Sequence, residues 1–179
     1  KKSIMDSINK PYLETESTNA LSSINDFWGI YRQLSQQKDF VPYSYEFIKN
    51  EADVFLREGK ARWYLGKVEG KIVSSALIIY SHKTAFYHHG ANLLTKEPIS
   101  HLLHWQIILD AKNIGFEYYN MWGGTLSDSV NHPWRGLTQF KKNFGCELIK
   151  FLPAMDYPFS KKYLINYLVE TIRKKSKRL

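Results

Sequence analysis

The chain has 179 residues, of which 44% are hydrophobic and 15% aromatic, so it can build the core of one globular domain and is not a disordered segment. Its 25 Lys and Arg residues outnumber its 17 Asp and Glu residues, and the net charge of +8 favours anionic partners such as nucleic acid, pyrophosphate groups or an anionic membrane face. The single cysteine excludes an internal disulfide, and no apolar run approaches the ~20 residues that cross a bilayer, which predicts a cytoplasmic protein.

The N-terminal part of the chain predicts an irregular segment followed by two helices. Residues 1–24 are polar and are interrupted by Pro11, so we expect an irregular N-terminal segment ahead of a single domain over residues 25–179. Apolar residues recur at helical spacing over residues 25–37, and Ser44 can cap a second helix.

The centre of the chain predicts three strands. Apolar and polar side chains alternate over residues 61–66, a continuous apolar run covers residues 72–80, and a third strand pattern covers residues 84–89. Because short turns join these strands, we expect the sheet to start antiparallel.

The spacing of apolar residues changes in the second half of the chain. A stripe of apolar side chains over residues 98–115 predicts a long helix. A short strand at residues 116–121, a short helix ending near Phe144, a strand at residues 147–152 and a helix from about Lys161 follow. This order predicts an α/β domain with a mixed β-sheet flanked by helices.

Several familiar catalytic and metal sites are missing. The chain has no G-x-S-x-G sequence, no P-loop and no dinucleotide-binding glycine pattern, and Cys146 has no helix N-terminus beside it to acidify its thiol. His88 and His89 are adjacent and His101 and His104 lie one helical turn apart, but no carboxylate or cysteine stands at ligand spacing from them. We therefore expect no metal site, and we interpret these histidines as half-buried residues or as polar pocket lining.

The sequence around Lys141 gives the strongest local signal. A short predicted helix carries an apolar face formed by Leu137, Phe140 and Phe144. Lys141 follows Leu137 by four residues and lies at the seam of that face, where it can bury its stem and direct its ammonium along the sheet edge. Considered alone, the same lysine would be interpreted as an ordinary surface side chain.

Four blocks of the sequence together resemble the FemABX family, the aminoacyl-tRNA-dependent transferases that build peptidoglycan side bridges. They resemble its second domain, which has a GNAT-like (acyl-CoA N-acyltransferase-like) fold. Two positions depart from the family pattern, which often has Arg where this chain has Lys38 and Asp where it has Asn120. The four blocks are the helix followed by Lys38-Asp39-Phe40, the strand ending Tyr87-His88-His89-Gly90-Ala91, the segment 98–115, and the Gly-Gly and Phe-Lys-Lys-x-Phe-Gly unit within residues 120–145.

The resemblance implies an aminoacyltransferase that adds an amino acid from aminoacyl-tRNA to the stem peptide of a peptidoglycan precursor, without a cofactor. An amine of the stem peptide would attack the activated ester, so the protein has to position both substrates and stabilise the oxyanion. Phe140 and Lys141 are implied at the end of the aminoacyl-tRNA, where the ammonium of Lys141 can contribute ~3 kcal/mol to transition-state stability. The sequence shows no obvious protein base for the amine proton.

The resemblance also implies contacts with the precursor, which is UDP-MurNAc-pentapeptide or its lipid-linked form. Lys38 and Tyr43 are candidates for its pyrophosphate, and Tyr87 and His89 for its sugar and peptide. The two tyrosines can also be interpreted as aromatic residues at the edge of the core. The full set of expected substrate-binding residues is Lys38, Tyr43, Tyr87, His89, Trp122 and Arg135.

Two other functions fit the same fold. One is an acyl-CoA-dependent GNAT N-acyltransferase, for which acetyl-CoA would be the co-substrate. Residues 92–97, where such enzymes hold the CoA pyrophosphate, contain no glycine, and Glu97 places a negative charge there, which argues against CoA. The other is a non-catalytic basic module that binds tRNA or a partner domain.

The family resemblance also bears on the extent and location of the protein. It implies two GNAT-like domains in each enzyme, and the sequence lacks an initiator methionine, so we expect half of a two-domain enzyme or a fragment. A lipid-linked acceptor would draw the protein to the inner face of the membrane without a spanning helix.

Overall fold

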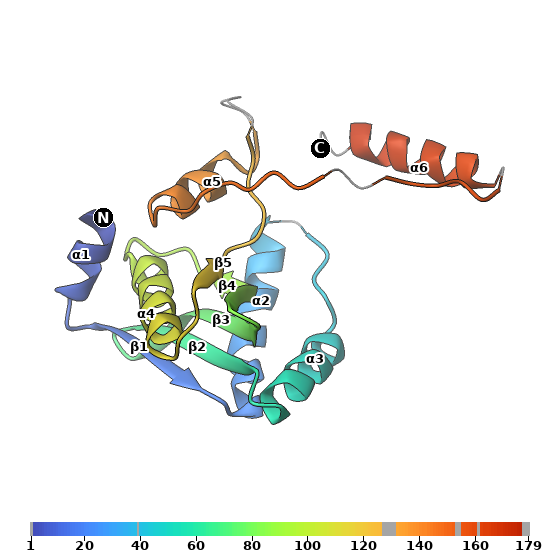
Figure 1. Cartoon of the computed structure of the whole chain (residues 1–179). Coiled ribbons are helices and arrows are strands. Elements are labelled where there is room, and N and C mark those ends of the chain that lie inside the picture. The colour runs from blue at the N-terminus through green and yellow to red at the C-terminus, as the bar shows by residue number, and fades with distance from the viewer. Residues whose placement is uncertain (1, 39, 127–131, 153–154, 161, 177–179) are drawn as a thin grey trace. The chain divides into compact units, whose positions relative to one another are not determined.

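The computed structural model describes residues 2–38, 40–126, 132–152, 155–160 and 162–176 (Figure 1). The chain divides into two compact units, Lys1–Glu147 and Leu148–Leu179. Among the helices of the described residues, none combines the length and the hydropathy needed to cross a bilayer.

A five-stranded mixed sheet forms the centre of the first unit. Its strands lie in the order β1-β2-β3-β4-β5, with antiparallel pairing from β1 to β4 and parallel pairing between β4 and β5. The antiparallel start predicted from the three central strands is therefore confirmed. The strands are β1 (Leu13–Thr18), β2 (Ala61–Val68), β3 (Lys71–Ser81), β4 (Thr84–Asn92) and β5 (Tyr118–Asn120).

Three long helices confirm the helical spacing of the apolar residues. Ser44 caps the second of them as predicted, since its Oγ accepts a hydrogen bond from the backbone N–H of Phe47 at 3.2 Å. The helices are α2 (Ile24–Lys38), α3 (Tyr45–Arg57) and α4 (Ile99–Asn113).

These helices cover both faces of the sheet (Figure 1). Helices α2 and α3 pack on one face, around buried residues that include Phe27, Ile48, Trp63 and Leu77. Helix α4 packs on the other face, around buried residues that include Tyr64, Ile78, Leu103 and Ile107. The result is a layered α/β domain, as the order of elements predicted.

The first 24 residues correct the expectation of an irregular N-terminal segment. They contain α1 (Lys2–Ile8), strand β1 and the short 3-10 helix η1 (Leu21–Ser23). β1 is an edge strand that buries Leu13 and exposes polar side chains, of which Glu16 forms an ion pair with Lys67 of β2 at 2.6 Å. Because an edge strand can remain polar on its open side, its sequence lacks the apolar pattern by which strands are predicted.

A β-bulge interrupts the pairing of β3 with β4. Leu77 pairs with His89 and the next residue, Ile78, pairs with Tyr87, so His88 is an extra residue without a partner in the ladder. Successive side chains of a strand normally alternate between faces, and an extra residue shifts that alternation. The bulge therefore decides which residues of β4 face α4 and which face α3.

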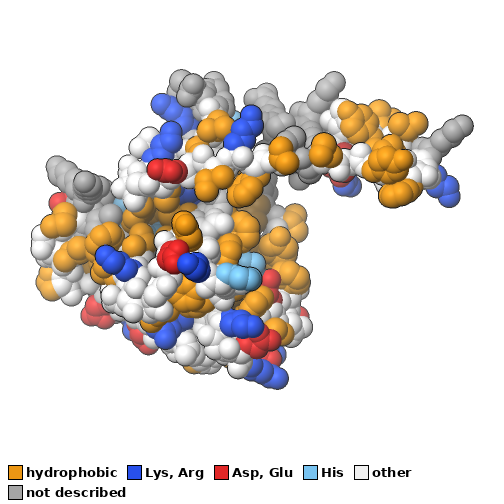
Figure 2. Space-filling view, viewed as in Figure 1, with side chains coloured by type: hydrophobic (Ala, Val, Ile, Leu, Met, Phe, Trp, Pro, Cys, Tyr) orange, Lys and Arg blue, Asp and Glu red, His pale blue; other side chains and the backbone are white. Residues whose placement is uncertain are grey.

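The C-terminal part of the chain contains two further helices, α5 (Arg135–Lys142) in the first unit and α6 (Tyr163–Ser176) in the second. The helix predicted from about Lys161 corresponds to α6. The strand predicted at residues 147–152 is wrong, because all six residues are described and none belongs to a strand. Their apolar side chains match a strand pattern, but among the described residues their backbone does not pair with any strand of the sheet. Figure 2 shows hydrophobic side chains along this second unit. The exposed hydrophobic side chains of α6 include Leu164, Ile165, Leu168 and Ile172.

Candidate functional site

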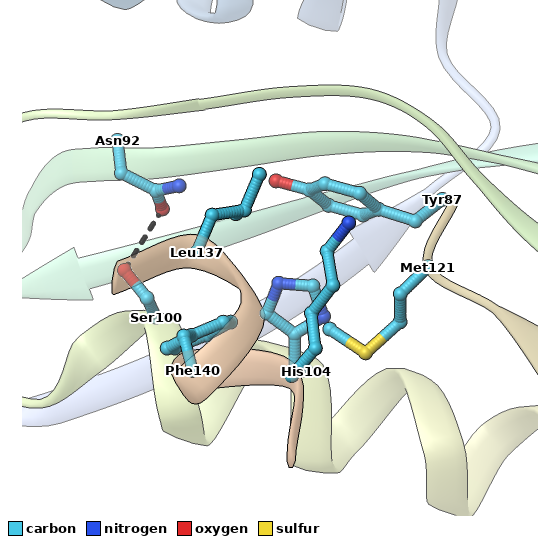
Figure 3. Close-up of a pocket in the computed structure, with 8 residues that line it drawn as sticks. Tyr87, Asn92, Ser100, His104, Met121, Leu137 and Phe140 are labelled. Atoms are coloured by element: carbon cyan, nitrogen blue, oxygen red, sulfur yellow. Dashed lines mark hydrogen bonds between the residues drawn. The ribbon is translucent and has the colours of Figure 1, made fainter. Parts of the chain in front are cut away.

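A small pocket lies where β4 and β5 separate. The two strands pair over only three residues each, and the last pair is Phe86 with Asn120. Beyond that pair the space is closed by side chains of β4, α4, α5 and the loop after β5 (Figure 3). The cavity volume is about 210 Å³, and its lining consists of Tyr87, Asn92, Ser100, His104, Met121, Leu137, Phe140 and Lys141. Because pockets for drug-sized ligands measure roughly 300–1,000 Å³, this cavity is small for a whole ligand of that size.

Lys141 is the cationic group of the pocket. It lies on α5 and is 9% exposed, although the neighbouring Lys142 on the same helix is exposed. Its Nζ donates a hydrogen bond to the backbone carbonyl of Gly123 in the loop after β5. Burial lowers the pKa of the Lys141 ammonium, and the nearby Cys146 thiol opposes this shift. The buried, partly desolvated ammonium agrees with the seam position predicted from the sequence.

A neutral histidine lies beside this lysine. His104 of α4 is 3% exposed, and its Nδ1 is hydrogen-bonded to the hydroxyl of Tyr119 at 2.8 Å. Burial lowers the pKa of His104 to about 3, helped by the charges of His101 and Lys141, so the imidazole is neutral at neutral pH. The hydroxyl of Tyr119 also stays protonated, because burial raises its pKa.

Aromatic rings form the walls of the pocket. The ring of Phe140 lies 4.8 Å from that of His101 and 5.2 Å from that of His104, measured between centroids. The ring of Tyr87 lies 4.6 Å from His104 on the β4 side, and burial raises the pKa of its hydroxyl to about 12. Gly90 makes room for this tyrosine, because a Cβ at position 90 would lie 1.7 Å from the Tyr87 hydroxyl oxygen.

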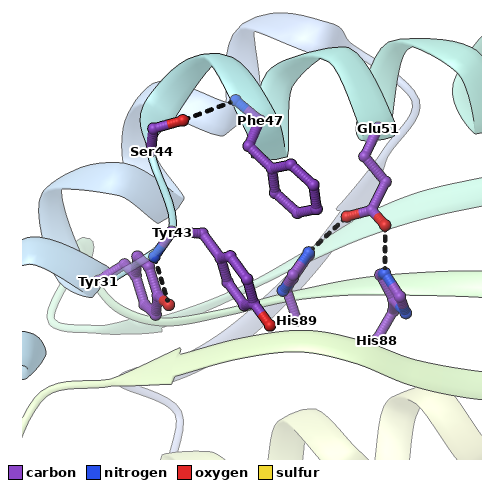
Figure 4. A network of polar contacts seen from close by, with 7 residues as sticks. All are labelled: Tyr31, Tyr43, Ser44, Phe47, Glu51, His88 and His89. Atoms are coloured by element: carbon purple, nitrogen blue, oxygen red, sulfur yellow. Dashed lines mark hydrogen bonds and ion pairs between the residues drawn. The ribbon is translucent and has the colours of Figure 1, made fainter. Parts of the chain in front are cut away.

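Two other predicted residues, Tyr43 and His89, lie on the opposite face of the sheet (Figure 4). His89 Nε2 is 2.6 Å from an oxygen of Glu51 on α3, and the ring of Tyr43 lies 6.0 Å from that of His89. The indole of Trp122 lies 6.3 Å from the ring of His88. Tyr87 and His89 were predicted to lie together on the sugar and peptide, whereas the bulge at His88 separates them onto two faces.

Lys38 and Arg135 belong to neither group. Both are exposed, Lys38 as the last residue of α2 and Arg135 as the first residue of α5. Of the eight predicted site residues, the pocket thus brings together Tyr87, Phe140 and Lys141.

Three further residues of these two groups were not predicted as site residues. His104 was considered only as a half-buried helix residue or pocket lining, and its partner Tyr119 was not considered. Glu51 corrects the reasoning about metal ligands, because it brings a carboxylate to His88 and His89 from another element. Its separation of 37 residues from His88 leaves no spacing signal that could have revealed it.

A model of the FemAB family matches residues 49–171. The chain is similar to the crystal structure of FemX, with a TM-score of 0.72 and 13% identity over 80% of this chain and 52% of that chain. It therefore spans about half the length of FemX. No curated protein matches it by sequence.

Two acetyltransferase structures are also similar. A predicted acetyltransferase from Clostridium acetobutylicum with acetyl-CoA has a TM-score of 0.61 and 9% identity, covering 80% of this chain and 96% of that chain. An aminoglycoside acetyltransferase from an uncultured soil metagenomic sample, in complex with sisomicin, has a TM-score of 0.57 and 16% identity, covering 83% and 97%. At these identities the likeness shows the fold, which is GNAT-like.

Proposed function

Because the chain belongs to the FemAB family, we propose that it takes part in transferring an amino acid from aminoacyl-tRNA to the stem peptide of a peptidoglycan precursor. The observation that carries this proposal is the buried Lys141 side chain, which lines a cavity of about 210 Å³ with room for a group as small as an aminoacyl moiety. The polynucleotide and the precursor would lie outside the cavity, with only the reacting ester inside.

Aminolysis of the ester needs a fixed positive charge near the carbonyl oxygen and does not require a protein nucleophile. The stem-peptide amine forms a C–N bond with the ester carbonyl, the C–O bond to the tRNA ribose breaks, and the ribose oxygen leaves with a proton. The Lys141 ammonium, which donates a hydrogen bond to the backbone carbonyl of Gly123, would stabilise the negative charge that develops on the carbonyl oxygen of the ester. Because this charge is fixed before the reaction, little reorganisation is needed in the transition state.

His104 is unsuited to act as the general base. Its pKa of about 3 lies far below the pKa of about 10 of an alkylamine, so it would accept the amine proton only at great cost. We assign His104 and Tyr119 the role of holding Tyr87 and Phe140 in place around the ester. The amine proton would pass to the leaving ribose oxygen, directly or through water.

The precursor would contact exposed residues away from the cavity. Lys38 and Tyr43 remain candidates for its pyrophosphate, where a charge-assisted hydrogen bond contributes about 1.5–3 kcal/mol. The net charge of +8 supports binding of both polyanionic substrates. Since the chain spans 52% of FemX, we propose that a second GNAT-like domain completes the precursor site, in the cytoplasm or at the inner membrane face.

Calorimetric titration tests this proposal. The purified chain, and the longest natural protein that contains it, would be titrated with UDP-MurNAc-pentapeptide and separately with acetyl-CoA. We expect saturable binding of the pentapeptide by the longest protein, weakened in Lys38→Ala and unchanged in Lys60→Ala. Binding of acetyl-CoA without any binding of the pentapeptide would contradict the proposal.

The second candidate is an acyl-CoA-dependent N-acyltransferase. One observation favours it: the match covers 96% of the chain of a predicted acetyltransferase whose crystal structure is with acetyl-CoA. Against it, residues 92–97 offer no glycine, and Glu97 is held there by an ion pair with Lys10 at 2.6 Å. The titration with acetyl-CoA separates the two candidates. If the protein binds tRNA but transfers no amino acid in an assay with charged tRNA, it would be a non-catalytic module.

A further inference from the structure

Two adjacent histidines share one carboxylate on the face of the sheet that packs against α2 and α3. Successive strand residues normally point to opposite faces, but the bulge at His88 turns both imidazoles to the same side. His88 Nε2 lies 2.8 Å from Oε1 of Glu51, and His89 Nε2 lies 2.6 Å from Oε2 (Figure 4). The two elements that carry this cluster, α3 and β4, belong to the packed first unit.

The nature and convergence of these atoms define a ligand set. One ligand atom from each of the three side chains lies within 4.8 Å of the other two. Two imidazole nitrogens and a carboxylate oxygen form the donor set of many three-ligand zinc sites. We propose that Glu51, His88 and His89 bind a divalent transition-metal ion of the zinc type.

The required rearrangement is small. In a tetrahedral site with Zn–N and Zn–O bonds of about 2.0–2.2 Å, neighbouring ligand atoms lie about 3.3 Å apart. The two imidazole nitrogens are 2.8 and 2.6 Å from different oxygens of Glu51, and the three ligand atoms lie within 4.8 Å of one another, so the carboxylate has to withdraw by roughly half an ångström and the imidazoles have to turn towards a shared ion. Rotation about the side-chain bonds of Glu51, His88 and His89 would supply these movements.

The three ligands now hold one another through hydrogen bonds. The carboxylate of Glu51 can only accept hydrogen bonds, so each imidazole now carries its proton on Nε2. Burial raises the pKa of Glu51, but the hydrogen bonds from His89 and His88 outweigh it and lower the pKa overall. Burial lowers the pKa of His89, which keeps that imidazole neutral. On metal binding each imidazole has to free its Nε2 lone pair, by moving the Nε2 proton to Nδ1 or by releasing it.

The cluster is accessible and leaves room for a further ligand. The side chains of His88, Glu51 and His89 are 26%, 22% and 12% exposed, so they border on solvent and are not sealed in the core. Tyr43 and Trp122 flank the two imidazoles and are themselves about half exposed. With three protein ligands, a fourth position is left for water or for an anionic group of a bound molecule.

Metal titration of the tag-free, EDTA-treated chain tests the site. We expect one Zn²⁺ per chain by calorimetry, and a d–d absorption band of four- or five-coordinate Co²⁺ that Zn²⁺ abolishes. Since the loss of even an outer-shell partner costs about 10–100-fold in metal affinity, Glu51→Gln should weaken binding by more than about 100-fold. His82→Asn is the matched control: this exposed histidine lies in the β3–β4 turn at φ 50°, which asparagine tolerates, and its replacement should leave the affinity unchanged.

Two outcomes would overturn the proposal: no saturable binding by the unmodified chain, or equal affinity in a folded Glu51→Gln variant. If that variant does not fold, histidine ring resonances of the unmodified chain decide the question. Zn²⁺ should shift the resonances of His88 and His89 and leave those of His82 in place. Resonances of His88 and His89 that stay unchanged at saturating Zn²⁺ would reject the site.

Discussion

Tyr87 and His89 lie two residues apart on β4, yet their side chains lie on opposite faces of the sheet. The ring of Tyr87 faces α4 and lies 4.6 Å from that of His104, whereas His89 faces α3 and bonds to Glu51 at 2.6 Å. The extra residue at the bulge reverses the alternation of faces between them. One strand therefore supplies side chains both to the Lys141 pocket and to the Glu51 cluster.

The contact between Gly90 and Tyr87 predicts the effect of a single added methyl group. In Gly90→Ala the new Cβ would lie 1.7 Å from the Tyr87 hydroxyl oxygen, so the tyrosine must leave its position in the pocket wall. We expect a loss of about 1–3 kcal/mol in the free energy of unfolding, measured by urea denaturation. Gly29→Ala is the control, because the space around that helical glycine is open and alanine should stabilise α2 by roughly 0.5–1 kcal/mol. Equal effects of the two substitutions would contradict the close packing of Tyr87 against Gly90.

The buried neutral His104 predicts how stability depends on pH. In the unfolded chain His104 takes up a proton near its ordinary pKa of 6.5, whereas in the folded chain it does so only near pH 3. The unfolded state therefore binds more protons, and the contribution of His104 to stability falls as the pH drops from about 6.5 towards 3. The free energy of unfolding should decline less steeply over this range in His104→Leu than in the unmodified chain. An unaltered slope in His104→Leu would refute the neutral buried imidazole.

The lowered pKa of Lys141 predicts a pH profile for the proposed transfer. The reaction needs the attacking amine deprotonated and Lys141 protonated, so kcat/KM should rise and then fall with pH. The falling limb should lie below 10.5, the ordinary pKa of lysine, because burial lowers that of Lys141. In Lys141→Arg, whose guanidinium keeps its proton, the falling limb should move to higher pH in whatever activity remains. A limb that stays in place in this variant would show that another group titrates.

The long helices and the central strands were predictable from the sequence because their signals are local. Helices α2 and α3 carry apolar stripes, α4 is apolar over most of its length, and Ser44 marks the start of α3. The strand predicted at residues 147–152 was wrong because an apolar pattern says nothing about whether a partner strand is present. Strand β1 was not predicted, because its pairing with β2 at the sheet edge satisfies its backbone while most of its side chains remain polar.

The candidate site was predictable only in part, for a related reason. The position of Lys141 on a predicted helix face indicated its burial, and the pocket agrees with that indication. The meeting of Glu51 with His88 depends on the packing of α3 against the sheet, which is a long-range contact. The separation of Tyr87 from His89 depends on one extra residue in β4. Position 88 is a histidine, and neither a glycine nor a turn residue there predicts the bulge from the sequence.

The most direct test of the proposed function compares two neighbouring lysines in an aminoacyl transfer assay. The longest natural protein that contains this chain would be given charged tRNA with a radiolabelled amino acid and UDP-MurNAc-pentapeptide, or its lipid-linked form, and the labelled peptide would be quantified. Lys141 is buried against the Gly123 carbonyl and Lys142 is exposed, so the pair separates a role in the pocket from a contribution to overall charge. We predict that Lys141→Met lowers kcat by about 10²–10³-fold, the cost of losing an oxyanion-stabilising group, and that Lys142→Met leaves it nearly unchanged. Equal rates in the two folded variants would contradict the assignment of Lys141 as the charge that stabilises the transition state. No transfer by the unmodified protein would contradict the proposed reaction itself.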